Sequence, residues 1–258
     1  MKKINDYNAV IKGLKAWIPV IMTDCNAENA VLGMSGGTDS LVVGKALVDA
    51  IGPDHVFGMY MPNGVQADIE DARRCVKAAG IKRTFEANLA LACMAAEATI
   101  KLAGPNTKEP LNAQAKTNLI PRVRQAVEYG VAQAYVPKSV VICTANLSEL
   151  MMGYFTLWAD MGSFAPIGSL TKTEVRQLGL ALGLPEDLVL KAPADGLSGM
   201  TDEERLGFTY EQIDDFIRND GANLSEGVRM AIANRAQAME FKRKAINLKS
   251  YVPNLEIA

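Results

Sequence analysis

The chain has 258 residues, of which 49% are hydrophobic and 22% charged, and its net charge is −2 at pH 7. This composition supports one sizeable core and excludes a disordered chain or a miniature fold that depends on disulfides. The near-neutral charge excludes the broad basic surface that nucleic acids and anionic membranes attract. No apolar run approaches the roughly 20 residues that span a bilayer. We therefore expect neither a nucleic-acid partner nor a membrane partner.

The first 20 residues place polar side chains between apolar ones at helical spacing, which predicts an amphipathic helix and not a secretion signal. The four cysteines, Cys25, Cys75, Cys93 and Cys143, are scattered without a CxxC pair, and His55 is the single histidine. Buried, reduced thiols of a cytoplasmic protein fit this pattern better than disulfides or a zinc site. His55 precedes an apolar run, where we expect a turn or a strand edge.

Strand-like and helix-like segments alternate along the chain. The first three strands are predicted at residues 30–34, 56–61 and 140–144, and helices at 39–50 and 68–79 separate the earlier ones. Strands that alternate with helices indicate an α/β fold with a doubly wound parallel sheet flanked by helices. Further helices are predicted at 87–105, 118–134, 172–182, 210–219 and 225–245. The segment 191–207 is a long loop rich in Gly, Pro, Asp and Ser, a type of loop that is usually functional.

A glycine-rich loop follows the first strand and opens a helix. Its residues are Gly33, Met34, Ser35, Gly36, Gly37, Thr38, Asp39 and Ser40. Such glycines let backbone N–H groups approach an anion, and the helix N-terminus adds favourable partial charge. A simple glycine turn, with Asp39 or Ser40 as the helix N-cap, is the alternative. The loop is not a Walker loop, which needs Gly-Lys followed by Ser or Thr. It is not a GxGxxG fingerprint either, because its glycines are spaced differently.

The loop resembles the pyrophosphate loop of the ATP pyrophosphatase superfamily, whose members cleave ATP between the α- and β-phosphates. Within that superfamily, five blocks in order resemble the NAD synthetase family. Beyond the loop they are the NxxxRxR segment 118–124, a single block that joins TxNxxE (144–149) to GYFT (153–156), the LTK segment 166–175, and the late loop with TDEE at 191–210. The resemblance implies a sheet of the adenine nucleotide α-hydrolase type.

The resemblance also implies roles for single residues. Asp39 and Glu149 would hold Mg²⁺, and Asp39 and Lys172 would be catalytic. Glu149 follows a predicted buried strand, where α/β sheets place their ligands. The ATP-binding residues would be those of the loop 33–40 together with Thr144, Lys172 and Glu204. The deamido-NAD-binding residues would be Arg124, Leu157, Ser163, Phe241 and Lys242, whereas Arg122 is as compatible with a structural ion pair.

The dinucleotide-reading positions depart from the family pattern. Leu157 replaces a Lys, Ala159 replaces a Gly, and Ser163 stands where an Asp is frequent, in a segment that is one residue shorter. Phe241 precedes Lys242 where the family often has a His-Lys pair. These departures concern contacts with the pyridine nucleotide more than the ATP chemistry. The aromatic residues Tyr154, Phe155 and Trp158 are expected in the core.

The function that the resemblance implies is the ATP-dependent amidation of deamido-NAD with ammonia, through an acyl-adenylate, to give NAD, AMP and pyrophosphate. ATP and Mg²⁺ would be required, and the family usually forms homodimers. Residues 1–258 are expected to form one synthetase domain without a glutaminase domain, and segment 191–207 to form a lid. The alternatives are another amidating or thiolating enzyme of the superfamily and a nucleotide-binding relative without catalysis.

Overall fold

Four parallel strands form the centre of the fold, in the order β4–β3–β2–β5. The computed structural model describes residues 2–66, 69–104, 111–159, 161–191, 201–246 and 248–257. The strands are β2 (Asn29–Gly33), β3 (Val56–Tyr60), β4 (Arg83–Glu86) and β5 (Ser139–Val141). The chain moves outward from β2 to β3 and β4, then returns to add β5 on the other side of β2. The predicted doubly wound sheet is confirmed, and its topological switch point lies between β2 and β5.

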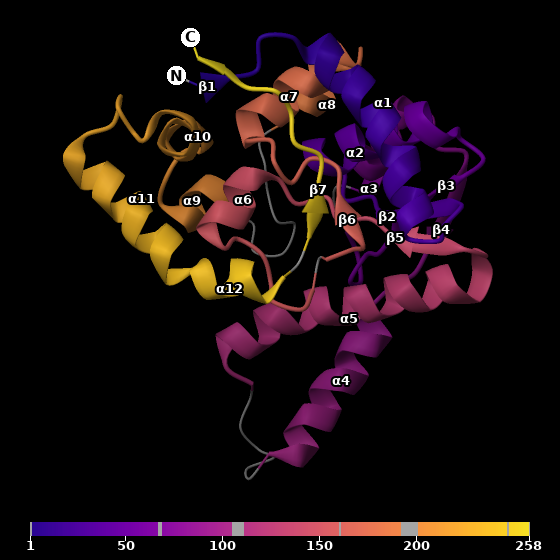
Figure 1. The fold of residues 1–258 in the computed structure, drawn as a ribbon. Coiled ribbons are helices and arrows are strands. Elements are labelled where there is room, and N and C mark those ends of the chain that lie inside the picture. Colours follow the sequence, from indigo (N-terminus) through magenta and orange to yellow (C-terminus); the bar gives the residue numbers. More distant parts are fainter. Residues whose placement is uncertain are drawn as a thin grey trace.

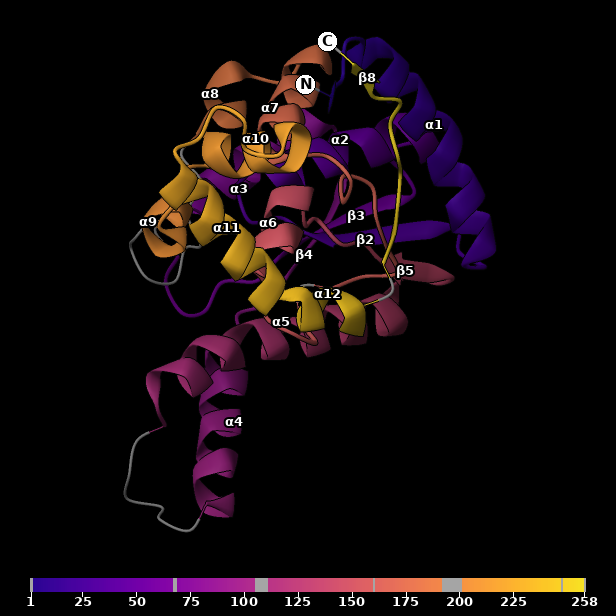
Figure 2. The ribbon, with the colours of Figure 1, turned by 60° about the vertical axis from the view of Figure 1, so that its left-hand side comes forward.

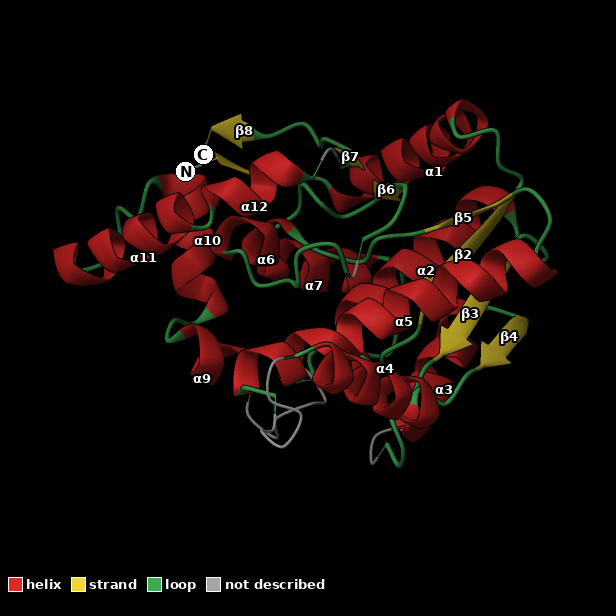
Figure 3. Ribbon diagram, turned by 90° about the horizontal axis from the view of Figure 1, so that it is seen from below, coloured by secondary structure: helices red, strands yellow, loops and turns green. Residues whose placement is uncertain are grey.

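Helices cover both faces of this sheet because the strands carry apolar residues on both sides. Ala30 and Leu32 of β2 pack into the large core formed with α1 (Tyr7–Asp24), α2 (Thr38–Ile51) and α3 (Ile69–Ala79). Val31 points to the opposite face, where α5 (Ala113–Tyr135) covers it. Figure 3 shows α5 lying across the strands on that side. The predicted amphipathic N-terminal helix is α1, whose buried residues line the large core.

The second half of the chain builds a layer of helices beside β5. Strand β6 (Phe164–Ala165) continues the sheet beyond β5 through a parallel bridge from Ile142 to Phe164, and it pairs with β7 (Lys249–Ser250). The antiparallel pair of β1 (Lys2–Lys3) and β8 (Glu256–Ile257) brings the two termini together (Figure 1). The helices of this half are α6 (Leu147–Met152), α7 (Lys172–Ala181), α8 (Glu186–Val189), α9 (Asp202–Leu206), α10 (Tyr210–Asn219), α11 (Glu226–Ala238) and α12 (Glu240–Ala245).

Some predicted boundaries are wrong. Helix α5 begins at Ala113 and not at 118, since Asn112 caps it, and it continues through Pro121. The single helix predicted over 225–245 is two helices that meet at Met239. Strand β4 escaped prediction because it is a polar edge strand.

Helices α4 (Ala90–Ala103) and α5 form a hairpin from which α4 projects away from the body of the molecule, whereas most of α5 lies against the body (Figure 2). Cys93 is the only buried residue among the described side chains of α4. Several large apolar side chains of α4 are exposed instead: Leu91, Met94, Ile100 and Leu102. The hairpin therefore presents an apolar helix face to its surroundings.

The thiols and the histidine lie near where the sequence placed them. Cys75, Cys93 and Cys143 are buried, and Cys25 is half-buried. His55 is exposed just before β3, and its Nδ1 lies 3.1 Å from Oδ1 of Asn29. Across the described residues, none of the helices combines the length and apolar character that a membrane span requires.

Candidate active site

The glycine-rich loop lies between β2 and α2, at the carboxyl edge of the sheet. Gly36 adopts a φ of 84°, and Gly37 caps α2 without any side-chain hydrogen bond to the helix N-terminus. The first backbone N–H groups of α2 are therefore available to an anion. The Oγ atoms of Ser35 and Ser40 lie 3.3 Å apart beside the loop. Thr38 has a structural role through its hydroxyl, which donates to the carbonyl of Val189.

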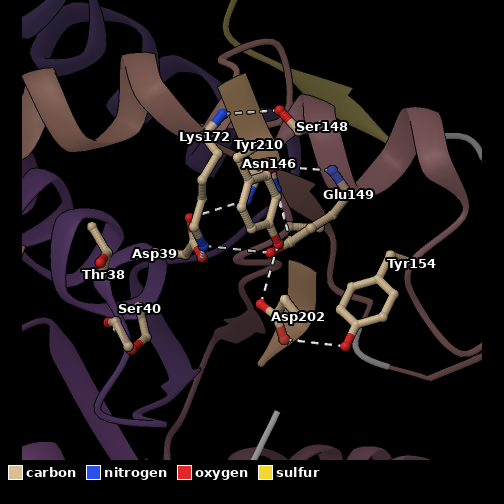
Figure 4. Close-up of polar contacts among 12 residues, drawn as sticks. Thr38, Asp39, Ser40, Asn146, Ser148, Glu149, Tyr154, Lys172, Asp202 and Tyr210 are labelled. Atoms are coloured by element: carbon tan, nitrogen blue, oxygen red, sulfur yellow. Dashed lines mark hydrogen bonds and ion pairs between the residues drawn. The ribbon is translucent and has the colours of Figure 1, made fainter. Parts of the chain in front are cut away.

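Three charged residues from three helices converge beside this loop (Figure 4). The ammonium of Lys172 forms an ion pair with Oδ2 of Asp39, and it lies 3.6 Å from Oε1 of Glu149. Asp39 belongs to the first turn of α2, Glu149 to the first turn of α6, and Lys172 begins α7. The predicted catalytic and metal-binding residues thus form one cluster, although 133 positions separate Asp39 from Lys172.

Burial controls the electrostatics of this cluster. Burial and the neighbouring charge of Asp39 raise the pKa of Glu149 from 4.5 to about 8, against the opposing effect of Lys172. Burial lowers the pKa of Lys172, but the charges of Asp39 and Glu149 outweigh it and raise this pKa to about 12. Lys172 is therefore a permanent cation, only 2% exposed. Two carboxylates that crowd one another in a buried place favour a bound cation.

The cluster rests on polar residues that sequence reasoning missed. Nδ2 of Asn146 donates to Asp39, and the Asn146 side chain also caps α6 in a capping box with Glu149. The ring of Tyr210 lies 5.2 Å from the Lys172 ammonium. The hydroxyl of Tyr210 donates to the buried carboxylate of Asp202. The N-x-x-E spacing of a capping box was a signal available for Asn146. Asp202 and Tyr210 lie in the late-loop block that resembles the family, but no role in the site was predicted for them.

Trp158 corrects the expectation that the aromatic residues 154, 155 and 158 belong to the core. Tyr154 packs against a core cluster as expected, and its hydroxyl also donates to Asp202. Trp158 is 66% exposed and has a φ of 63°, which makes its prediction as core wrong. Phe155 packs against a core cluster as expected.

Two further residues, Thr144 and Glu204, were assigned to ATP. Thr144 is half-buried between β5 and α6, at the same edge of the sheet as the loop. The carboxylate of Glu204 caps α9 by accepting hydrogen bonds from the N–H and the hydroxyl of Thr201. The T-x-x-E spacing already allowed this capping role. The long loop predicted as a lid falls largely on residues 192–200, which lie outside the described residues.

The residues assigned to the dinucleotide are spread over several elements. Arg124 of α5 lies near Cys93, where its charge opposes the rise in the Cys93 pKa that burial causes. Nη2 of Arg122 donates to the carbonyl of Leu157, so this arginine braces the segment after α6. The N–H of Ser163 donates to Val141 at the end of β5.

Lys242 is held by the protein itself. Its Nζ donates to the carbonyls of Gly153 and Phe155 at 2.8 and 2.7 Å and lies over the Phe155 ring. Burial, followed by the charge of Arg235, lowers the pKa of Lys242. The preceding Phe241 is 58% exposed and offers no polar group. These contacts brace α12 against the segment that follows α6.

The carboxylates of the site suit a divalent cation in their chemistry, but they supply only part of its coordination shell. Asp39 and Glu149 supply hard carboxylate oxygens around one point, which Mg²⁺ prefers. Within the described ranges, no set of three or more His, Cys, Asp or Glu side chains is placed to hold a metal. The protein would thus contribute two ligands, and the substrate and water would supply the rest, as is usual for Mg²⁺ at phosphate sites.

Comparisons with known proteins agree with this geometry. The chain is 34% identical over 245 residues to the NH(3)-dependent NAD(+) synthetase of Finegoldia magna, covering 93% of this chain and 95% of the relative. It is 41% identical over 196 residues to the synthetase of the same name from Methanococcus aeolicus, covering 74% of each. Among solved structures, NMN synthetase from Francisella tularensis matches 97% of this chain and 100% of its own, with a TM-score of 0.82 and 30% identity.

The family model described as NAD synthase matches residues 10–246. That range contains the glycine-rich loop and all three charged residues of the cluster. Enzymes of this family are ligases that use ATP as a substrate. The phosphate loop, the buried Asp39–Lys172–Glu149 cluster and this match together show that the chain belongs to the NAD synthase family.

Proposed function

We propose that this protein amidates deamido-NAD with ammonia at the expense of ATP, and forms NAD, AMP and pyrophosphate. The observation that carries the proposal is the convergence of Asp39, Glu149 and Lys172 beside an uncapped helix N-terminus. A phosphate chain bound there would meet backbone N–H groups on one side and a buried cation on the other. Relatives of 34–41% identity carry the name of this activity.

The chemistry suits a site without a histidine base. A carboxylate is a poor electrophile, so one oxygen of the nicotinate attacks the α-phosphorus of ATP and pyrophosphate leaves. Ammonia then attacks the acyl-adenylate carbonyl, AMP leaves with the former carboxylate oxygen, and the nitrogen loses a proton. The buried Lys172 and the N–H groups of α2 neutralise charge on the phosphates.

We also propose that Asp39 and Glu149 hold Mg²⁺. The ion would act as a Lewis acid that neutralises phosphate oxygens during pyrophosphate release. The raised pKa of Glu149 supports this assignment: burial and the charge of Asp39 disfavour its carboxylate even beside Lys172, and an added cation would stabilise it. Titration of the protein with Mg²⁺ in the presence of an unreactive ATP analogue tests it, with Glu149→Gln as the variant that should bind more weakly.

A second candidate substrate is the mononucleotide counterpart, nicotinic acid mononucleotide. Two observations favour it: the similarity to an NMN synthetase over the whole chain, and the state of the dinucleotide positions. Leu157 and Phe241 carry no polar group, and the Lys242 ammonium is already bound to two backbone carbonyls. The same adenylylation and amidation would apply to either carboxylate.

One experiment separates these functions. Purified protein is incubated with ATP, Mg²⁺, ammonium and either deamido-NAD or nicotinic acid mononucleotide, and pyrophosphate, AMP and the amide product are quantified. Amide product with a higher kcat/KM for deamido-NAD supports the main proposal, and a higher value for the mononucleotide supports the second. If neither acceptor supports the release of pyrophosphate, both proposed functions are refuted. Lys172→Ala should abolish turnover.

The assembly we propose is a homodimer through the projecting hairpin. Its helix α4 exposes Leu91 and Met94, which are 80% and 66% exposed, and it carries only Glu97 and Lys101 as charged residues. A second copy offers a matching apolar face. Sedimentation of the native protein and of Leu91→Glu tests this, since the variant should become monomeric. We place the reaction in the cytoplasm, consistent with four scattered cysteines that include no CxxC pair.

A further inference from the structure

Helices α6 and α7, which carry Glu149 and Lys172, are joined at their N-termini. The N–H of Leu147 donates to the carbonyl of Leu170 at 2.8 Å, and the N–H of Lys172 donates to Oγ of Ser148 at 2.9 Å. Ser148 is the residue immediately before Glu149. The hydroxyl of Ser148 therefore links the two helix ends that present the charged groups of the site (Figure 4).

A carboxylate from a third helix controls this link. Asp214 of α10 is 6% exposed, and its Oδ1 accepts a hydrogen bond from Oγ of Ser148 at 2.5 Å. Its Oδ2 accepts from the N–H of Thr173 at 2.9 Å and from the Thr173 hydroxyl at 2.6 Å. Both carboxylate oxygens are thus used by the two helix ends, and Asp214 lies 66 positions from Ser148 and 41 from Thr173 in the chain.

The polarity of this chain of hydrogen bonds is determined. Oγ of Ser148 accepts from the N–H of Lys172, and its single hydroxyl proton is donated to Oδ1 of Asp214. The lone pairs of Ser148 are then directed to the N–H of Lys172, which is one of the helix N–H groups that lack a partner within α7. Hydrogen bonds to a charged acceptor are stronger than neutral ones, so the carboxylate orients the whole chain.

We propose that Asp214 is a positioning residue for the reaction, which acts through Ser148 and Thr173 to hold Lys172 and Glu149 in register against Asp39. Lys172 reaches its partners through a long side chain, so a small rotation of its helix end displaces the ammonium. A misplacement of about 1 Å at a reacting centre costs on the order of 100-fold in rate. The activity readout of this inference rests on the proposed function.

The test compares Asp214→Asn with Asp215→Asn, its neighbour on α10. Asn keeps the shape of Asp214 but replaces one accepting oxygen with an NH₂ group. At that position two hydrogen-bond donors then face each other, and the contact with Ser148 or Thr173 is lost. Asp215 suits as control because its side chain accepts from Asn219 and Asn223 at the C-terminal end of α10 and the loop after it. We expect kcat to fall about 10- to 100-fold in Asp214→Asn, with the KM for ATP within about threefold, and no change in Asp215→Asn.

A second variant covers the case in which Asp214→Asn fails to fold. Ser148→Ala removes the relay hydroxyl and leaves both contacts of Thr173 with Asp214 intact. It should also lower kcat, and the double variant should be no slower than the worse single variant, because both changes break the same chain. Additive losses, or a folded Asp214→Asn and Ser148→Ala with kcat within twofold of native, would overturn the inference.

A readout independent of turnover separates failure of this inference from failure of the proposed function. The rate at which acetic anhydride modifies Lys172, relative to the exposed Lys244, is followed by peptide mass spectrometry. Lys172 should react several-fold faster in folded Asp214→Asn than in the native protein, and no faster in Asp215→Asn. If the native protein forms no NAD, the proposed function fails while this comparison still decides the role of Asp214; equal reaction rates would refute that role.

Discussion

Replacement of Gly36 by Ala tests the phosphate loop most directly, because the structure supplies a matched control. Gly36 has a φ of 84° and Gly52 a φ of 86°, so an alanine is strained at both positions. A Cβ on Gly36 would lie 2.9 Å from the backbone N and 3.3 Å from the Cα of Ala72, whereas a Cβ on Gly52 would have nothing within 4 Å. Only the Gly36 variant adds a collision with backbone.

The expected losses in the free energy of unfolding follow from the backbone strain at both positions and from the collision at Gly36. An alanine held at such a positive φ costs about 1–3 kcal/mol, offset by about 0.4–1 kcal/mol because the unfolded chain loses freedom. Gly52→Ala should therefore cost about 1 kcal/mol. The collision with α3 adds about 1–3 kcal/mol, as overpacking does elsewhere. Gly36→Ala should cost about 2–4 kcal/mol and melt roughly 2–12 °C below Gly52→Ala.

Urea unfolding of both variants measures the free energies of unfolding, and calorimetric titration measures ATP binding. Since the loop must move to relieve the collision, Gly36→Ala should also bind ATP at least tenfold more weakly, and Gly52→Ala should bind it normally. Equal losses of stability in the two variants would refute the steric reasoning. Native-like ATP affinity in Gly36→Ala would refute the assignment of this loop to phosphate.

Three further predictions concern the charged cluster and the nitrogen donor. Asp39→Asn and Glu149→Gln should lower kcat at limiting Mg²⁺ by at least about 100-fold with the fold intact, and wild-type rates in both would contradict the metal assignment. Because the folded pKa of Glu149 is raised from 4.5 to about 8, the folded state holds its proton more tightly than the unfolded state. Stability without ligands should therefore fall as the pH rises between these values, and Glu149→Gln should flatten that slope in urea titrations at several pH values. Purified protein should form NAD from ammonium chloride and not from ammonia-free glutamine; equal rates from both would disprove ammonia dependence.

The sequence by itself determined those helices, strands and loops that short-range patterns of residues encode. Alternating apolar runs and helices were enough for β2, β3, β5 and the doubly wound order, because strands buried on both faces read as continuous apolar segments. The order of motifs identified the loop 33–40, Asp39, Glu149 and Lys172. Helix α10 was predicted to the residue because its start carries the cap Thr209 and its period is strong.

Tertiary structure decided the side-chain contacts between chain segments that are far apart in sequence and meet only in the folded protein. The contact of Lys172 with Tyr210, the Asp202 carboxylate that holds Tyr210, and the Asp214–Ser148 link join helices far apart in sequence, which no local pattern encodes. Likewise, the two backbone carbonyls that hold Lys242, a residue predicted to bind the dinucleotide, show only in three dimensions. Residue identity indicates which hydrogen bonds a side chain can make; the packing of its neighbours selects which one it makes.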